Sequence, residues 1–217
     1  MKPGITTKEL DRIAETYIRD HGGKPGFLGY NGYEATLCTS VNDEIVHGIP
    51  GAYVLQEGDI VSLDCGVILD GLNTDACVTV GVGQIDPGTQ KFLDDVSKTL
   101  EDVLKLLVKE GMQTGSISAF IELSLRREGY SPVRGLTGHG LGKELHQFPD
   151  IPNVGQAHTG PSLPLHTLIA IEPIASLGSD SFLQDDDGWT LRTADGSLAC
   201  HFEHTVLIEQ DHCEIIA

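Results

Sequence analysis

Apolar residues recur with the 3.6-residue period of an amphipathic helix in three stretches of the chain. The longest stretch, residues 89–108, predicts a helix with one core-facing stripe. That stripe consists of Phe92, Leu93, Val96, Leu100, Val103, Leu104 and Leu107. The two shorter stripes consist of Leu10, Ile13, Ala14, Tyr17 and Ile18, and of Ile117, Phe120, Ile121 and Leu125. Thr6 and Glu9 have the spacing of a capping box, which predicts that the first helix starts at Thr6.

The two shorter helices belong to a weak internal repeat. Residues 2–23 resemble residues 109–130, because each segment runs from Lys-x-Gly-apolar to a Thr and then into an apolar stripe. Strands that carry acidic or histidine positions follow each helix. We therefore predict an α+β fold in which two similar halves, about 1–85 and 86–217, form a single domain over residues 1–217. Their strands are expected to form one antiparallel sheet.

A β-hairpin is predicted for residues 59–83, where two β-rich runs flank Asp70 and Gly71. This dipeptide favours a two-residue type I′ turn, which pairs Asp64 with Cys77. Asp75 then lies on the same face as Asp64, as a diagonal neighbour roughly 7–8 Å away at the backbone. Asp70 is interpreted as a solvated turn residue.

Acidic side chains on an otherwise apolar face repel one another and are costly to desolvate, and a bound cation removes both problems. The second half supplies further candidates: His139 lies among glycines, and Glu172 and Glu203 lie within apolar strands. Two Asp, two Glu and one His form an oxygen-rich set that suits two divalent ions. The spacing thus favours a dinuclear metal site over separate solvated acids.

The charge balance is strongly acidic, since 32 Asp and Glu against 14 Lys and Arg give a formal net charge of −18. Nucleic acids and anionic membranes attract basic surfaces, so neither is expected as a partner. The five cysteines include no Cys-x-x-Cys pair, and the N-terminal segment has no apolar signal-peptide core. The chain also lacks the run of about 18 apolar residues that a membrane span needs, so we expect a reduced, cytoplasmic location.

Seven short strings mark the chain between residues 47 and 205. They are HGIP (47–50), LDCGV (63–67), TDA (74–76), GHGLGKELH (138–146), IEP (171–173), DGWT (187–190) and FEHT (202–205). In this order and spacing they resemble the type I methionine aminopeptidases of the M24 metallopeptidase family. The similarity extends from residue 2 to the C terminus. It implies the pseudo-symmetric pita-bread fold, a curved antiparallel sheet flanked by helices, in agreement with the repeat.

By position, the resemblance implies five ligands for two divalent metal ions, which would be Co, Mn, Fe or Zn. The ligands are Asp64, Asp75, His139, Glu172 and Glu203. Asp75 and Glu203 would bridge the ions, Asp64 would hold one, and His139 and Glu172 would hold the other. The implied activity is hydrolysis of the initiator methionine from nascent proteins and peptides, with a preference for small second residues. Nascent N termini are therefore the expected partners, with proximity to the ribosome.

The resemblance also assigns catalytic and substrate-binding residues. Glu172 would move the proton of the attacking water to the leaving amine, while His47 and His146 would contact the substrate and stabilise the tetrahedral intermediate. The implied methionine pocket consists of Tyr30, Tyr33, Cys38 and Trp189, and such an apolar wall suits a thioether. Two residues depart from the family pattern. Phe27 stands where relatives often have Cys and Leu145 where many have Phe, so the finer side-chain preference is open.

Three other functions fit parts of this pattern. A prolidase-like or creatinase-like enzyme shares the fold and ligands, but normally has an additional N-terminal domain and lacks the FEHT and DGWT strings. A non-catalytic binding homologue would have lost metal ligands, and all five are present. A metal-binding module without turnover has no need of His47 and His146. Cleavage of Met-Ala-Ser compared with Xaa-Pro peptides would separate these functions.

The repeat predicts one more helix. The second half begins with the 89–108 helix, whereas the first half begins directly on its Lys-x-Gly motif. Family members usually have a helix there, so the chain is expected to be short at this end by nature or truncated. The outer face of the first half, around residues 8–20, would then carry polar substitutions or serve for self-association or for binding a partner. The chain is accordingly expected to be a monomer or to self-associate through this face.

Overall fold

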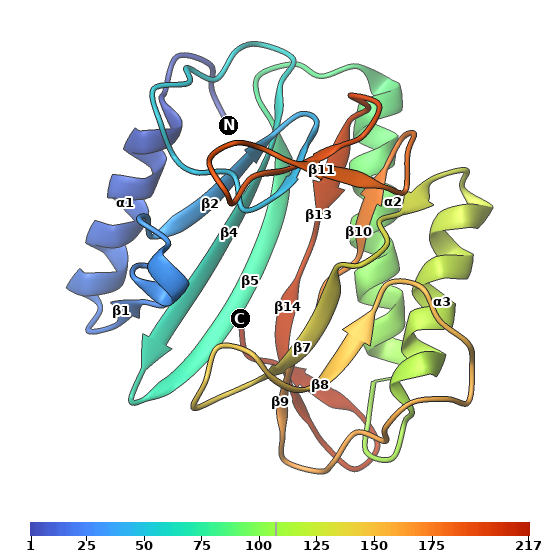
Figure 1. Ribbon diagram of the computed structural model, residues 1–217. Coiled ribbons are helices and arrows are strands. Elements are labelled where there is room, and N and C mark those ends of the chain that lie inside the picture. The colour runs from blue at the N-terminus through green and yellow to red at the C-terminus, as the bar shows by residue number, and fades with distance from the viewer. Residues whose placement is uncertain (107) are drawn as a thin grey trace.

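The computed structural model describes residues 1–106 and 108–217, with the elements arranged as in Figure 1. The helices are α1 (Thr7–Asp20), the 3-10 helix η1 (Tyr30–Gly32), α2 (Pro87–Leu106) and α3 (Thr114–Arg127). The first strands are β1 (Lys24–Pro25), β2 (Leu37–Val41), β3 (Glu44–Val46), β4 (Ile60–Leu69) and β5 (Leu72–Gly81). The later strands are β6 (Ser131–Pro132), β7 (Thr137–Leu141), β8 (Gln147–Pro152), β9 (Leu168–Ile171), β10 (Ile174–Ser176), β11 (Phe182–Gln184), β12 (Leu191–Thr193), β13 (Ala199–His201), β14 (His204–Ile208) and β15 (Cys213–Ile215).

The three predicted helices are confirmed. Thr6 caps α1, because its hydroxyl oxygen accepts a hydrogen bond from the Glu9 amide at 3.1 Å. Two residues of the predicted α1 stripe face solvent, since Ile13 is 48% and Tyr17 65% exposed. The described residues of the α2 stripe are all buried, and Leu107 lies outside the described residues.

All strand pairings among the described residues are antiparallel, as predicted, but they are divided among four sheets instead of one. The sheets have the strand orders β1-β4-β2 with β5 paired to β4, β15-β14-β9-β7-β8, β13-β10-β6, and β11-β12-β3. The hairpin of β4 and β5 has the predicted register, with Asp64 opposite Cys77. Asp70 and Gly71 have φ values of 51° and 81°, as a type I′ turn requires.

The two larger sheets meet where β5 lies beside the start of β14 (Figure 1). Cys77 and Glu203 form an isolated antiparallel bridge there, with backbone hydrogen bonds of 3.3 and 2.9 Å. Next to it, the Thr205 hydroxyl accepts a hydrogen bond from the Asp75 N–H at 2.8 Å and donates one to the Asp75 carbonyl at 2.7 Å. This junction brings carboxylates from the two halves of the chain together.

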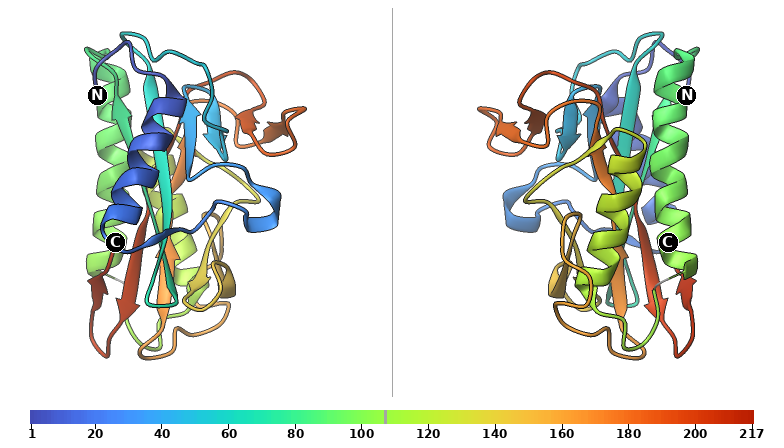
Figure 2. Two further views of the ribbon diagram at one scale, coloured as in Figure 1. Left: turned by 90° about the vertical axis from the view of Figure 1, so that its left-hand side faces the viewer. Right: turned by 90° about the vertical axis from the view of Figure 1, so that its right-hand side faces the viewer.

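The helices gather on one side of the strands, while η1 and the β11–β12 hairpin project from the other side (Figure 2). The largest apolar cluster joins α2 and α3 to β9 and β14, and includes Phe92, Ile117, Ile169 and Val206, all completely buried. This core supports the strands from one side and leaves their other face available for a site. None of the described helices has both the length and the apolar character that a membrane crossing requires. The predicted division into two repeated halves within one domain stays a prediction.

Candidate active site

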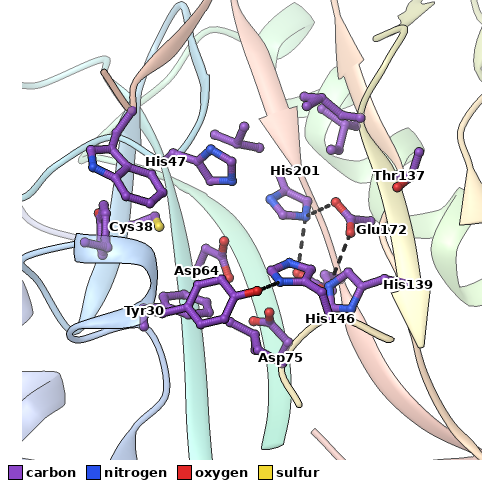
Figure 3. A pocket seen from close by; sticks show the side chains of 18 of the residues that line it. Tyr30, Cys38, His47, Asp64, Asp75, Thr137, His139, His146, Glu172 and His201 are labelled. Carbon is purple, nitrogen blue, oxygen red and sulfur yellow. Dashed lines mark hydrogen bonds and ion pairs between the residues drawn. The ribbon is translucent and has the colours of Figure 1, made fainter. Parts of the chain in front are cut away.

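A cavity of about 370 Å³ is lined by residues from η1, β4, β5, β7, β10 and β13. It contains every residue that the sequence predicted for metal binding, catalysis or substrate binding. These are Tyr30, Tyr33, Cys38, His47, Asp64, Asp75, His139, His146, Glu172, Trp189 and Glu203. Figure 3 shows the labelled members of this set pointing into a common space from opposite walls.

The five predicted ligands come from five places in the chain. Asp64 and Asp75 lie on β4 and β5, His139 lies on β7, Glu172 follows β9, and Glu203 lies between β13 and β14. Four of them are buried, and the Glu172 side chain is 11% exposed. Asp75, His139 and Glu203 each offer a ligand atom within 4.8 Å of the other two. The cluster is therefore compact enough to hold a cation.

Burial shifts the pKa of every carboxyl in this cluster upward. Burial, with the nearby Glu203 charge, raises the pKa of Asp64 to about 7, and burial raises the pKa of Glu203 to about 8. The pKa values of Asp75 and Glu172 are raised well above their usual range, first by burial and then by the charge of Glu203. Four carboxylates cannot all ionise here without a compensating positive charge, which divalent cations would supply.

Unsatisfied polar atoms converge at the same place. Among the described residues, Asp64 Oδ1, Asp75 Oδ1, Glu203 Oε1 and His201 Nε2 are buried and have no hydrogen-bond partner. Buried polar atoms without partners are uncommon in folded proteins because each costs free energy. Their convergence on one point fits a metal site, since coordination would satisfy them together.

His139 is positioned for coordination by the glycines on either side of it. A Cβ at Gly138 would lie 2.4 Å from the Ala170 carbonyl oxygen, and a Cβ at Gly140 would lie 2.3 Å from the Phe148 carbonyl oxygen. Only glycine at these positions allows β7 to lie this close to β9 and β8. His139 Nδ1 is 2.9 Å from the Gly140 carbonyl oxygen. A carbonyl only accepts hydrogen bonds, so Nδ1 carries the proton and Nε2 is free to bind a metal.

Two other histidines of the cavity are neutral at physiological pH. Burial, with the nearby His201 and His146, lowers the pKa of His47 to about 4, and burial also lowers the pKa of His146. His47 has a positive φ of 60°, a conformation that non-glycine residues seldom adopt and that is concentrated at functional sites. The Tyr30 hydroxyl lies 2.8 Å from His146 Nδ1, which orients that ring in the cavity.

The predicted methionine pocket forms the apolar end of the cavity. Tyr33 and Trp189 meet edge to face with ring centroids 5.1 Å apart. The Tyr33 hydroxyl donates hydrogen bonds to the carbonyl oxygens of Leu37 and Gly48. Phe27 and Leu145, the two departures from the family pattern, are both buried in the same cluster with Tyr33 and Cys38.

Phe27 packs directly on Gly66, where a Cβ would lie 2.5 Å from the Phe27 ring. The larger ring is thus accommodated by a glycine of the neighbouring strand. This packing gives a structural reason why phenylalanine fits at position 27, where relatives often have cysteine.

The sequence prediction missed one potential metal ligand of the cavity, His201. Its side chain is buried, and its Nε2 lies 3.3 Å from Glu203 Oε2 and 3.6 Å from Glu172 Oε2. Asp64, His201 and Glu203 form a second group of ligand atoms within 4.8 Å of one another. The missed signal was the spacing of two residues between His201 and Glu203, which in an extended chain directs both side chains to the same face.

Comparisons with known proteins agree with this site. The profile of Metallopeptidase family M24 matches residues 1–210. The chain is 43% identical to the methionine aminopeptidase of Clostridium perfringens, over all of this chain and 86% of that protein. It is 42% identical to methionine aminopeptidase 1 of Bacillus subtilis, over all of this chain and 87% of that protein.

The crystal structure of methionine aminopeptidase from Thermotoga maritima superposes with a TM-score of 0.96 at 40% identity, covering 98% of this chain and 86% of that one. This superposition confirms the expected pita-bread fold. The chain therefore belongs to metallopeptidase family M24, whose members are metal-dependent hydrolases. Within that family it is a member of the methionine aminopeptidases, which remove N-terminal methionine.

Proposed function

We propose that this chain hydrolyses the N-terminal methionine of newly made proteins with two divalent ions bound in the described cavity. The observation that supports this most directly is the convergence of four raised-pKa carboxyls and unsatisfied ligand atoms beside an apolar pocket. The proposed ligands are Asp64, Asp75, His139, Glu172 and Glu203, with Asp75 and Glu203 shared by both ions. Oxygen-rich ligand sets with an imidazole accept Co, Mn, Fe or Zn, so supply in the cell decides which is used.

The ions would lower the pKa of water at the site, so that hydroxide is available near neutral pH. The protein supplies the proton carrier for this reaction. Glu172 lies at the edge of the cluster, with its two carboxylate oxygens 3.9 Å from His139 Nε2 and 3.6 Å from His201 Nε2. We assign it the role of accepting the water proton on a carboxylate oxygen and delivering it to the leaving amine.

His47 and His146 are assigned to the substrate carbonyl. Both rings line the cavity and are neutral, so each has one N–H to donate without adding a charge that would repel metal ions. If Tyr30 donates to Nδ1 of His146, the His146 proton is on Nε2 and can be directed at the substrate. Such donors stabilise negative charge as it develops on the carbonyl oxygen.

The apolar end of the cavity is assigned to the methionine side chain. Tyr30, Tyr33, Cys38 and Trp189 form its wall, and a thioether packs favourably against aromatic ring edges. Burial and the nearby Asp64 charge raise the pKa of Cys38 well above its usual range, so its thiol stays neutral and apolar. The pocket should therefore exclude charged side chains.

The biological setting follows from this chemistry. The substrates would be nascent N termini that carry methionine before a small residue such as Ala, Gly or Ser. This activity fits a cytoplasmic enzyme that works near the ribosome. The net charge of −18 gives no reason to expect nucleic acid as a substrate.

Peptide hydrolysis by the purified protein tests the proposal. With added Co²⁺ or Mn²⁺, Met-Ala-Ser should be cleaved, whereas Leu-Ala-Ser, Lys-Ala-Ser and Xaa-Pro peptides should be cleaved far more slowly. Trp189→Ala should raise KM for Met-Ala-Ser, while Leu183→Ala, at an exposed position of β11, serves as the matched control. Comparable cleavage of all these peptides would refute the pocket assignment.

A further inference from the structure

His201 is held rigidly at the end of β13 by the neighbouring strand β5. Its backbone N–H donates to the Thr79 hydroxyl at 3.0 Å, and that hydroxyl donates to the His201 carbonyl at 2.7 Å. The Cys77 thiol contacts the same carbonyl at 3.5 Å. With 2% of its surface exposed, His201 has little freedom to turn away from the cluster.

The imidazole nitrogen of His201 faces carboxylates without forming a hydrogen bond to them. Its Nε2 is 3.3 Å from Glu203 Oε2 and 3.6 Å from Glu172 Oε2, and it remains without a hydrogen-bond partner among the described residues. A cation bound by the same carboxylates would satisfy a buried imidazole nitrogen in this position. Figure 3 shows the His201 ring beside Glu172, with a dashed line joining the two side chains.

The distances within the group also suit coordination. Asp64, His201 and Glu203 each offer a ligand atom within 4.8 Å of the other two. Ligands that bind one ion at about 2.1 Å lie about 3–4.2 Å from one another in regular coordination geometries, so only small side-chain adjustments are needed. The group Asp75, His139 and Glu203 satisfies the same criterion.

We propose that His201 is an additional metal ligand, which binds through Nε2 the ion held by Asp64 and Glu203. This inference rests on the proposed two-ion site and extends its ligand set. Each ion would then have one imidazole, His201 for the one and His139 for the other, in addition to the shared Asp75 and Glu203. Glu172 lies between the two imidazoles.

This assignment has a consequence for metal selection. An ion bound only by carboxylates is held by hard oxygen ligands, which favour Mg²⁺, Ca²⁺ and Mn²⁺. An added imidazole shifts the preference of that position toward Co²⁺, Ni²⁺ and Zn²⁺. That position should therefore prefer Co²⁺ over Mn²⁺ more strongly in wild type than in His201→Gln.

Co²⁺ binding to the metal-free protein tests the assignment without reference to activity. Calorimetric titration of wild type should show two sites, and His201→Gln should weaken one of them at least about tenfold while leaving the other unchanged. Glutamine retains a hydrogen-bond donor but is a poor metal ligand, so it separates coordination from hydrogen bonding. His212→Gln is the control for adventitious binding, because His212 lies on the surface beside Asp211.

Proton NMR of the Co²⁺-loaded wild type provides a test that needs no variant. Each coordinated imidazole contributes one exchangeable N–H resonance shifted by the paramagnetic ion, so we expect two such resonances, one of which is lost in His201→Gln. The inference is overturned if wild type shows only one, or if His201→Gln binds two ions with both constants within about twofold of wild type. It is also overturned if His201→Ala weakens binding but His201→Gln does not, since His201 would then act by hydrogen bonding.

The outcomes also separate this inference from the proposed function. A wild-type protein that binds fewer than two Co²⁺ ions would overturn both the two-ion site and the role of His201. If wild type binds two ions and cleaves Met-Ala-Ser but is unaffected by His201→Gln, only the role of His201 fails.

Discussion

The metal-free protein should lose stability as the pH rises from 6.5 to 8, the reverse of what is expected for a protein with carboxylates stabilised by salt bridges. Burial raises the pKa of Asp64 to about 7 and that of Glu203 to about 8, so the folded state holds protons that the unfolded chain has released. Stability from a raised pKa is complete below the unfolded pKa of about 4 and is lost as the pH passes the folded pKa.

The buried histidines act in the opposite direction in the lower part of this window. Burial lowers the pKa of His47 and His139 to about 4 and also lowers the pKa of His146 and His201. The imidazoles of the unfolded chain have an ordinary pKa of about 6.5 and are half protonated at pH 6.5, so each of these four residues offsets about 0.4 kcal/mol of the loss between pH 6.5 and 8. The pKa values of Asp75 and Glu172 are raised in the same direction as those of Asp64 and Glu203, so they do not reverse the slope.

The size of the effect follows from proton linkage. Release of the Asp64 and Glu203 protons over this window lowers the free energy of unfolding by about 2 kcal/mol, at 1.36 kcal/mol per pH unit for each proton, and the histidines reduce the net loss to about 1 kcal/mol. For a chain of 217 residues this corresponds to a decrease in Tm of about 2–4 °C, since 1 kcal/mol shifts Tm by about 2–4 °C at this size.

Thermal unfolding of chelator-treated protein, followed by circular dichroism in buffers between pH 6.5 and 8, measures this slope. Glu203→Gln removes one titrating group and should flatten the slope, whereas Glu214→Gln, at an exposed position, should leave it unchanged. Excess Mn²⁺ should remove the slope, because bound metal keeps the carboxylates ionised. A Tm that is constant or rises between pH 6.5 and 8 without metal would refute the reasoning.

Three further predictions concern the metal ligands and their support. Glu203→Ala removes the carboxylate common to both ligand groups, so turnover of Met-Ala-Ser should be abolished; full activity with two ions bound would contradict its bridging role. At a fixed free metal concentration that does not saturate the site, metal occupancy and activity should fall as the pH drops below about 8, because Asp64 and Glu203 of the metal-free site then take up protons that compete with the metal; a flat pH–rate profile would argue against this. Thr205→Val leaves the Asp75 N–H and carbonyl unpaired and should lower the free energy of unfolding by about 1–3 kcal/mol in urea, whereas Thr205→Ser, which keeps the hydroxyl, should not.

Features with a local cause were predictable from the sequence. The helices follow from apolar spacing and from the Thr6 cap, which act within a few residues. The register of β4 and β5 follows from the turn at Asp70 and Gly71, and this turn alone puts Asp64 and Asp75 on one face. His139, Glu172 and Glu203 were candidates from their glycine-rich or apolar surroundings. The substrate-binding residues were predicted only through the resemblance to a family, because their partners are distant in the chain.

The tertiary structure decided which sheet edges meet. The Cys77–Glu203 bridge joins strands from opposite halves of the chain, and no periodicity in either strand indicates that pairing. The same contact sets the burial that raises the pKa of Glu203, because desolvation depends on every element packed around a group.

For His201, the sequence determines one part of its placement and the tertiary structure determines the other. The sequence contains the alternation that puts His201 and Glu203 on one face, but not the identity of the surface that this face meets. Only the packing of β13 and β14 against β5 directs His201 Nε2 at the carboxylates of Glu172 and Glu203. Side-chain direction is a local property of the backbone, whereas the formation of a metal site depends on distant strands meeting at one point.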